Sequence, residues 1–103
     1  MSLRGTGVFK KYQIATANAN PETIISGKSV LHALNIFNAG SSWVLHIYDA
    51  GSVTQITTAN EVFRYSTATG AGPFILDIIM NNGIVIRHEG TTGNAVISYD
   101  PDT

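Results

Sequence analysis

The sequence predicts an all-β fold, an antiparallel β-sandwich or jelly roll of eight to nine short strands. Short apolar runs rich in Val, Ile, Tyr and Phe recur along the chain, and turn sequences such as NANP, NAGSS, TGAGP and NNG separate them. No long stretch keeps the i, i+3, i+4 apolar spacing of an amphipathic helix. Many short, regularly spaced strands in 103 residues are typical of sandwiches, jelly rolls and small barrels.

The predicted strands follow one another without a linker or an internal repeat, so we expect a single domain over 8–103. The preceding residues 1–7 include two glycines and are predicted to form a flexible arm. Turn residues separate the strands: NANP, NAGSS, DAGS, TANE, TGAGP, NNG and GTTGN, in chain order. The strands are expected over 8–17, 22–26, 29–38, 43–49, 53–58, 61–66, 74–80, 84–89 and 95–99.

The strands over 29–38 and 43–49 form a predicted hairpin around the NAGSS turn. This pairing places His32 and His46 on the same face of neighbouring strands, within about 4.5–8 Å of each other. The second of these strands has no plainly hydrophilic face, because apolar residues occur at both parities. Its two predicted faces are Trp43, Leu45 and Ile47 on one side and Val44, His46 and Tyr48 on the other.

A second hairpin is predicted around Asn82-Gly83, because this dipeptide favours the type I′ turn of a two-residue loop. Counting outward from that turn places Asp77 opposite His88. A carboxylate beside an imidazole favours the charged ring, so this pairing predicts a raised pKa for His88. The remaining apolar residues divide into a presumed core, Phe74, Leu76, Ile78 and Met80, and a second apolar face, Ile75, Ile79, Ile84 and Ile86.

Apolar residues on both faces of these strands predict that something covers the second face. An antiparallel strand with one solvent-exposed face normally alternates between apolar and polar residues. Charged residues make up only 13% of the chain, against about 25% in a typical soluble domain. Burial of the second face in an assembly explains both observations, and coverage by the protein's own long loops is the alternative.

The composition excludes several classes of function. The formal net charge is -1 and the basic residues are scattered, so no surface for nucleic acid or an anionic membrane is expected. The chain has no cysteine, which excludes disulfides, thiolate catalysis and cysteine zinc sites. The N-terminal residues lack the apolar core of a signal peptide, and no apolar run is long enough for a membrane span.

The chemical motifs are weak, and the sequence predicts no catalytic, cofactor-binding or metal site. It contains no G-x-S-x-G elbow, no Walker lysine and no G-x-G-x-x-G. A metal site usually needs about three or four ligands, so His32, His46 and His88 would have to converge from three strands to form one. Asp77 and His88 are interpreted as a cross-strand ion pair rather than as part of a catalytic triad.

Three blocks of the sequence, SGKSVLHALNIFNAG, WVLHIYDAG and PFILDIIMNNGIVIRHEGTTGNAVISYDP, follow one another in a suggestive order. With this order and spacing, roughly residues 26–101 resemble the small β-sandwich virion proteins of tailed bacteriophages. The resemblance implies a capsid decoration or accessory surface role, commonly as an oligomer, and it brings no catalytic motif with it.

Three hypotheses follow. The first is a non-enzymatic virion structural protein, made in the host cytoplasm, that forms a homo-oligomer, expected to be a trimer, and contacts other virion proteins. It needs no cofactor, nucleic acid, membrane or small-molecule substrate, and its expected interface is Ile75, Ile79, Ile84 and Ile86. The second is a carbohydrate-binding, host-recognition module, for which the candidate aromatic residues are Trp43, Tyr48, Tyr65 and Tyr99. The third is a small metal-dependent enzyme that uses the three histidines.

Overall fold

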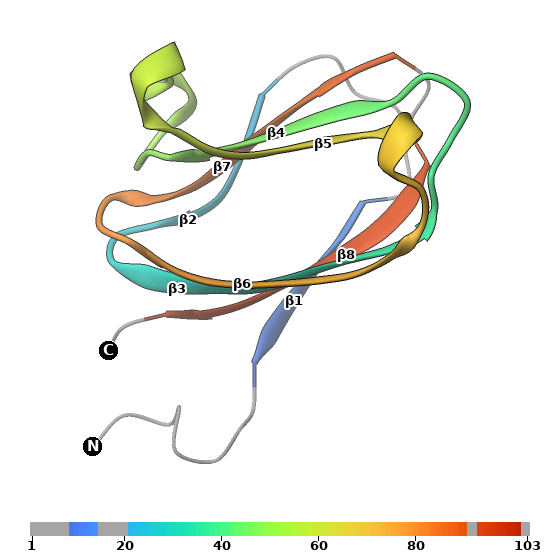
Figure 1. The fold of residues 1–103 in the computed structure, drawn as a ribbon. Coiled ribbons are helices and arrows are strands. Elements are labelled where there is room, and N and C mark those ends of the chain that lie inside the picture. Colours follow the sequence, from blue (N-terminus) through green and yellow to red (C-terminus); the bar gives the residue numbers. More distant parts are fainter. Residues whose placement is uncertain (1–8, 15–20, 91–92, 102–103) are drawn as a thin grey trace.

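The structure, a computed structural model, describes residues 9–14, 21–90 and 93–101. They form two layers of antiparallel sheet (Figure 1). The predicted arm over 1–7 lies outside the described residues. The described strands are β1 (Lys10–Ile14), β2 (Glu22–Ser26), β3 (Ser29–Asn38), β4 (Val44–Asp49), β5 (Glu61–Ser66), β6 (Gly72–Met80), β7 (Gly83–Glu89) and β8 (Asn94–Pro101).

The strand order is that of a jelly roll. One sheet, called sheet A, has the order β1-β8-β3-β6, and the other, sheet B, has the order β2-β7-β4-β5. The pairs β1–β8, β2–β7, β3–β6 and β4–β5 are all antiparallel, so the pairing is nested as in a chain folded in half. Rolling such a folded chain into two packed sheets produces the jelly roll. The predicted fold class is therefore confirmed.

Both predicted hairpins are wrong, because this topology places consecutive strands in opposite sheets at those points. β3 belongs to sheet A and β4 to sheet B, so the NAGSS turn crosses between the layers. β6 and β7 are separated in the same way. The Asn82-Gly83 turn signal marks a real reversal of the chain, but the two strands that it joins do not pair with each other.

The β6–β7 connection is held by groups from other strands. The carboxylate of Asp49, at the end of β4, accepts hydrogen bonds from the backbone N–H groups of Asn81 and Asn82, at 3.1 and 2.8 Å. Gly83 follows with a φ of +144°, a conformation that favours glycine. A Cβ atom there would lie 2.4 Å from the carbonyl oxygen of Ile25, so β2 also packs against this connection.

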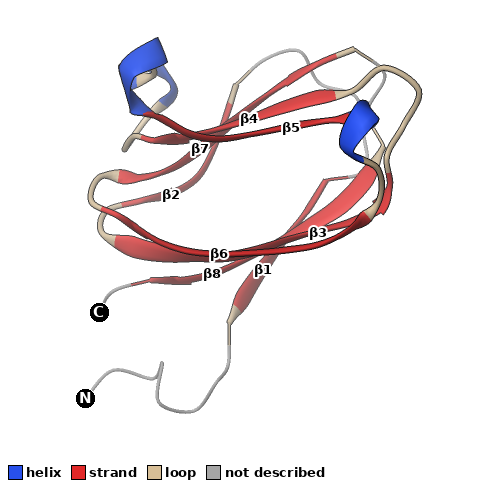
Figure 2. Ribbon diagram, in the orientation of Figure 1, coloured by secondary structure: helices blue, strands red, loops and turns tan. Residues whose placement is uncertain are grey.

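The segment 53–58, which the sequence predicted as a ninth strand, does not form one. It contains the 3₁₀ turn η2 (Val53–Gln55) and is followed by η3 (Thr58–Asn60), shown in blue in Figure 2 together with η4 (Thr67–Thr69). The side-chain amide of Asn60 donates to the carbonyl of Gln55 and its oxygen accepts from the backbone N–H of Thr57. These local hydrogen bonds compete with strand pairing.

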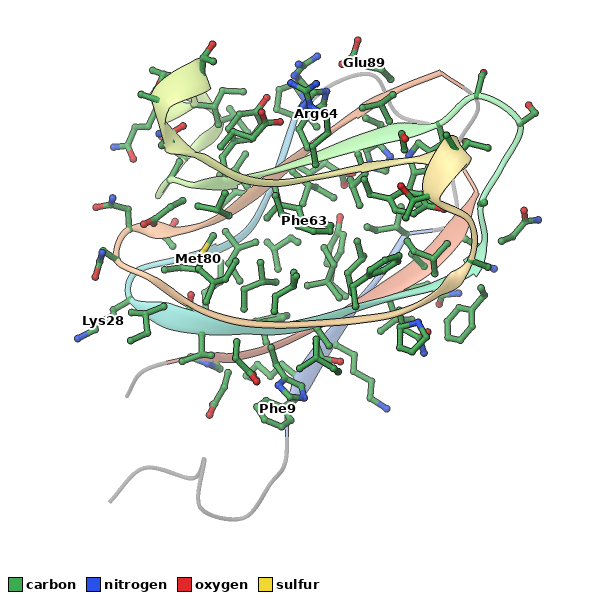
Figure 3. All side chains as sticks on the ribbon, viewed as in Figure 1. Phe9, Lys28, Phe63, Arg64, Met80 and Glu89 are labelled. Carbon is green, nitrogen blue, oxygen red and sulfur yellow. The ribbon has the colours of Figure 1, made fainter. Side chains whose placement is uncertain are left out.

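The core lies between the two sheets, where side chains such as Phe63 and Met80 meet (Figure 3). The presumed core face of β6 is confirmed, because Phe74, Leu76 and Ile78 pack on the buried cluster. Of the two predicted faces of the strand after NAGSS, the one with Trp43, Leu45 and Ile47 points into the core. The largest fully buried side chains are Trp43, Tyr65, Leu31, Leu34, Ile36, Leu45, Ile47, Met80, Ile84, Ile86, Ile97 and Val85.

Ile84 and Ile86 are in this core, each with an exposed fraction of 0%, so their assignment to the same face as Ile75 and Ile79 was wrong. The error follows from the hairpin, since β7 faces the interior from sheet B and not from sheet A. The opposite face of β7 is buried too. Val85 packs there with Tyr48 and Ala50 in a second small cluster, against which Ile56 of the β4–β5 connection lies.

Candidate functional site

The three histidines lie in three separate places. His32 is on the outer face of sheet A and His46 on the outer face of sheet B, while His88 points between the sheets. The prediction that His32 and His46 share a face was wrong because β3 and β4 are in different sheets. Within residues 9–14, 21–90 and 93–101, no group of three or more His, Cys, Asp or Glu side chains is placed to hold a metal ion.

His32 pairs with Asp77 on the outer face of sheet A. Its Nδ1 atom lies 2.6 Å from Oδ1 of Asp77, and its ring stacks on that of Phe9 with centroids 4.2 Å apart. Asp77 has a positive φ of +49° at a point where the β3–β6 register shifts between Leu31 and Ala33. Such bulges redirect side chains, and this one accompanies the close approach of Asp77 to His32.

Asp77 therefore does not pair with His88, and the predicted cross-strand ion pair is wrong. The two residues lie in different sheets, and their partners are His32 for Asp77 and Trp43 for His88. The parity of β6 was nevertheless correct, because Asp77 lies on the face opposite the core.

Two large apolar side chains flank Asp77 in β6 and are mostly exposed to solvent. Ile75 has an exposed fraction of 64% and Ile79 one of 61%. They share the outer side of sheet A with the stacked pair below the lower sheet in Figure 3, where Phe9 is labelled. We call this surface the A face and define it by Phe9, His32, Ile75, Asp77 and Ile79.

His46 forms an ion-pair cluster on the outer face of sheet B. Its Nδ1 atom contacts the carboxylate of Glu61 and its Nε2 atom contacts that of Glu89. Arg64 lies 3.5 Å from Glu61, and Arg87 lies 3.5 Å from Glu89. Arg64 and Glu89 project from this sheet at the top of Figure 3. These charges cover His46, which has an exposed fraction of only 5% although it points away from the core.

The cluster shifts the pKa values of its carboxyl groups downward. Burial of Glu61 acts to raise its pKa, but hydrogen bonding and charge attraction from His46, together with Arg64, outweigh burial and lower it. The hydrogen bond from His46 lowers the pKa of Glu89 in the same direction. Charges that satisfy one another in this way form a structural network rather than an open binding site.

His88 belongs to a buried polar chain that joins the two sheets. The indole Nε1–H of Trp43 donates to Nδ1 of His88 at 3.1 Å. On the other side of the ring, Nε2 lies 3.8 Å from Oε1 of Glu22 in β2. Glu22 in turn accepts a hydrogen bond of 2.5 Å from the hydroxyl of Tyr12 in β1. The chain runs from the start of β4 through β7 and β2 to the opposite sheet.

The pKa values along this chain follow from burial. Desolvation lowers the pKa of His88, and the nearby carboxylate of Glu22 only partly opposes that effect. The prediction of a raised pKa for His88 was therefore wrong. Burial, with hydrogen bonding and charge repulsion from Glu22, raises the pKa of Tyr12 to about 12.

The aromatic residues proposed for sugar stacking are mostly inside the protein. Trp43, Tyr65 and Tyr48 have exposed fractions of 0%, 1% and 5%, and Tyr99 packs on the core cluster. The rings of Trp43, Tyr48 and Tyr65 are therefore not open for stacking on a sugar, and Tyr99 is partly buried.

Sequence reasoning missed the acidic partners of the histidines. Glu61 and Glu89 lie 15 and 43 positions from His46 along the chain, so no local spacing connects them. Glu22 and His88 are likewise joined only by the β2–β7 pairing. The strand order was the missing information, because nested pairing alone brings β2 beside β7 and β4 between β5 and β7.

Comparison with family models and with curated proteins gives no match for this chain. Among the described residues, no helix is long and apolar enough to cross a membrane.

Proposed function

We propose that this chain is a non-enzymatic structural protein that self-associates through the A face, and that it serves as a decoration or accessory protein on a phage virion. The single observation that supports self-association most directly is the pair of exposed isoleucines in β6, Ile75 and Ile79. Scattered exposed apolar residues are ordinary on proteins. Here the two flank Asp77, which pairs with the His32 ring that Phe9 stacks on, in a chain with only 13% charged residues.

The A face suits face-to-face packing better than strand-to-strand pairing. β6 is an edge strand of sheet A, and an undisturbed edge strand is a template for pairing with another chain. Its ladder with β3 is interrupted near Asp77, whose φ is positive, and Pro73 removes a backbone donor. Both features disfavour extension of the sheet by a second β6, while leaving the apolar side chains available on the outer surface.

The size of sheet A is sufficient for such an interface. Four strands about 4.8 Å apart and up to ten residues long, at about 3.3 Å per residue, span roughly 19 by 33 Å. That plan area of about 600 Å² lies at the lower end of the roughly 600–1,000 Å² that each partner buries in a standard interface. A second copy of this chain is therefore the occupant that we propose.

The virion role rests on the resemblance of the sequence blocks and on an analogy of fold. Jelly rolls occur in viral capsid proteins, but also in lectins and cupins, so the fold by itself does not select among them. A carbohydrate-binding module remains the second candidate. The burial of Trp43, Tyr48 and Tyr65 weakens it, because these rings are not available for stacking.

The test is sedimentation velocity of the wild-type chain and of two variants at tens of micromolar. Ile79→Asp places a charge on the A face, where burial without a partner in an interface costs several kcal/mol. Val53→Asp is the matched control, since Val53 is also an exposed apolar residue, at 38%, but lies in η2 beyond β4 and off the A face. Circular dichroism confirms that each variant is folded.

We expect the wild type and Val53→Asp to sediment as oligomers and Ile79→Asp to sediment as a folded monomer. A monomeric wild type would contradict self-association and would favour a monomeric binding module, to be examined by glycan-array binding. An Ile79→Asp variant that assembles like the wild type would show that the interface is elsewhere.

A further inference from the structure

The chain from Trp43 to Glu22 fixes the protonation state of His88. An indole N–H can only donate, so the Nδ1 atom that accepts from Trp43 carries no proton. In the neutral ring the proton is then on Nε2, which points toward Oε1 of Glu22 at 3.8 Å. Within the described residues Nε2 has no hydrogen-bond partner, and the side chain of His88 is 2% exposed.

Protonation of this ring would break its contact with Trp43. An imidazolium has a donor at each nitrogen, so Nδ1–H would face the indole N–H, two donors directed at each other. One of the rings would have to move. The rings lie nearly parallel at 16° with centroids 5.9 Å apart, and Tyr65 packs edge-on against Trp43 from another direction.

We propose that the hydrogen bond between Trp43 and His88 is an acid-sensitive latch. It fixes the connection between β3 of sheet A and β4 of sheet B while His88 is neutral, and it breaks when His88 is protonated. This inference is independent of self-association through the A face. It goes beyond the proposed structural role because it gives the fold a defined response to pH.

Trp43 is well placed to transmit the change. Its backbone N–H donates to Oγ1 of Thr67 at 2.7 Å, and its carbonyl accepts from the backbone N–H of Thr67 at 2.9 Å. The same hydroxyl of Thr67 donates to the carbonyl of Ala39 at 2.8 Å. Displacement of the indole would therefore loosen the β3–β4 crossing and the β5–β6 connection together.

The surroundings of His88 determine the direction of the pH dependence. From β2, Glu22 faces the ring, and from β1, Tyr12 lies behind Glu22. β4 contributes the apolar Leu45 as the paired neighbour, and Tyr65 of β5 lies beyond Trp43. The folded pKa is lowered by burial, so unfolded chains bind protons first as the pH falls. Stability is then complete above the unfolded pKa of about 6.5 and decreases as the pH falls toward the folded pKa.

The test is urea unfolding at about pH 7.5 and about pH 5, on either side of the ordinary histidine pKa of about 6.5, followed by fluorescence of Trp43, the single tryptophan. His88→Gln keeps an acceptor for the indole and a donor toward Glu22 but does not titrate. The wild type is the reference, and both proteins are measured at the same low concentration. We expect the unfolding midpoint to fall on acidification in the wild type, and to fall by less than half as much in His88→Gln.

An equal fall in His88→Gln and the wild type would overturn the latch. If His88→Gln does not fold, NMR of the wild type alone still tests the proposal. Nitrogen NMR of the imidazoles should show the Nε2–H form of His88 at neutral pH, and the indole N–H signal of Trp43 should shift with the titration of His88. A ring protonated at Nδ1 at neutral pH, or an indole signal that ignores that titration, would contradict the proposal.

Discussion

Replacing Ile86 or Ile79 by alanine distinguishes the jelly roll from the hairpin that the sequence suggested. In the hairpin the two residues lie opposite each other on one face. In the structure Ile86 is 0% exposed in the core, whereas Ile79 is 61% exposed on the A face. The same chemical change should therefore have very different effects on the free energy of unfolding.

The magnitudes follow from the buried fraction of each side chain. Ile→Ala removes three carbon groups, and at about 0.8 kcal/mol for each buried group the transfer term is about 2.4 kcal/mol for Ile86. The cavity left in a closed core raises this to about 3–4 kcal/mol. Ile79 keeps only about two fifths of its surface from solvent and encloses no cavity, so its loss is about 1 kcal/mol or less.

Thermal unfolding at low protein concentration measures the difference. At about 4–8 °C per kcal/mol for a domain of this size, Ile86→Ala should lower the melting temperature by at least about 12 °C and Ile79→Ala by about 4–8 °C or less. If the chain self-associates through the A face, a higher protein concentration should raise the melting temperatures of the wild type and of Ile86→Ala more than that of Ile79→Ala, because association stabilises the folded chain. The difference in melting temperature from the wild type should then grow only for Ile79→Ala. Equal losses at low concentration would refute the assignment of β7 to sheet B.

Two further outcomes test the β6–β7 connection and the cluster on sheet B. Gly83→Ala should be strongly destabilising in thermal unfolding, because a Cβ atom would lie 2.4 and 2.5 Å from the carbonyl oxygens of Ile25 and Ala50 at a φ of +144°. Gly27→Ala, with a φ of +100° but no atom within 4 Å of the new Cβ, should lose only the backbone strain of about 1–3 kcal/mol, and equal losses would contradict the close packing. Glu61 has a lowered folded pKa, so its contribution to stability is present above the unfolded value of about 4.3 and is lost as the pH falls through the folded value. In Glu61→Gln, the melting temperature should therefore fall less steeply as the pH is lowered. A plot of melting temperature against pH that matches the wild type would show that the pair of Glu61 and His46 contributes nothing to stability.

Local patterns in the sequence were sufficient for the existence of most strands and for the core face of β6. β2, β3 and β5 begin and end where the turn residues indicated, because alternation and punctuation are local properties. The absence of the predicted strand over 53–58 also has a local reason. Its apolar residues Val53 and Ile56 belong to a connection that Asn60 closes with its own side-chain hydrogen bonds.

Pairing could not be read in the same way. Asn82-Gly83 favours a hairpin only if the strands on both sides remain neighbours, but here the turn leads from sheet A to sheet B and the carboxylate of Asp49 in β4 holds it. Each histidine partner depends on such long-range pairing. The ion pair of His32 and Asp77 came closest to a prediction. The sequence placed Asp77 correctly on the outer face of its strand, but it assigned His88 as the partner instead of His32.

The apolar second faces that first suggested an assembly have two different explanations in the structure. On β4 and β7 the protein covers them itself, with Ile56 lying against Tyr48 and Val85 and with the ion-pair cluster closing over His46. The rival interpretation, coverage by the chain's own loops, therefore applies to sheet B. On β6, by contrast, the apolar residues of the outer face, Ile75 and Ile79, remain exposed. Because Tyr48 and Val85 of sheet B are covered within the chain while Ile75 and Ile79 of sheet A are not, the proposed self-association is testable by substitutions on the A face.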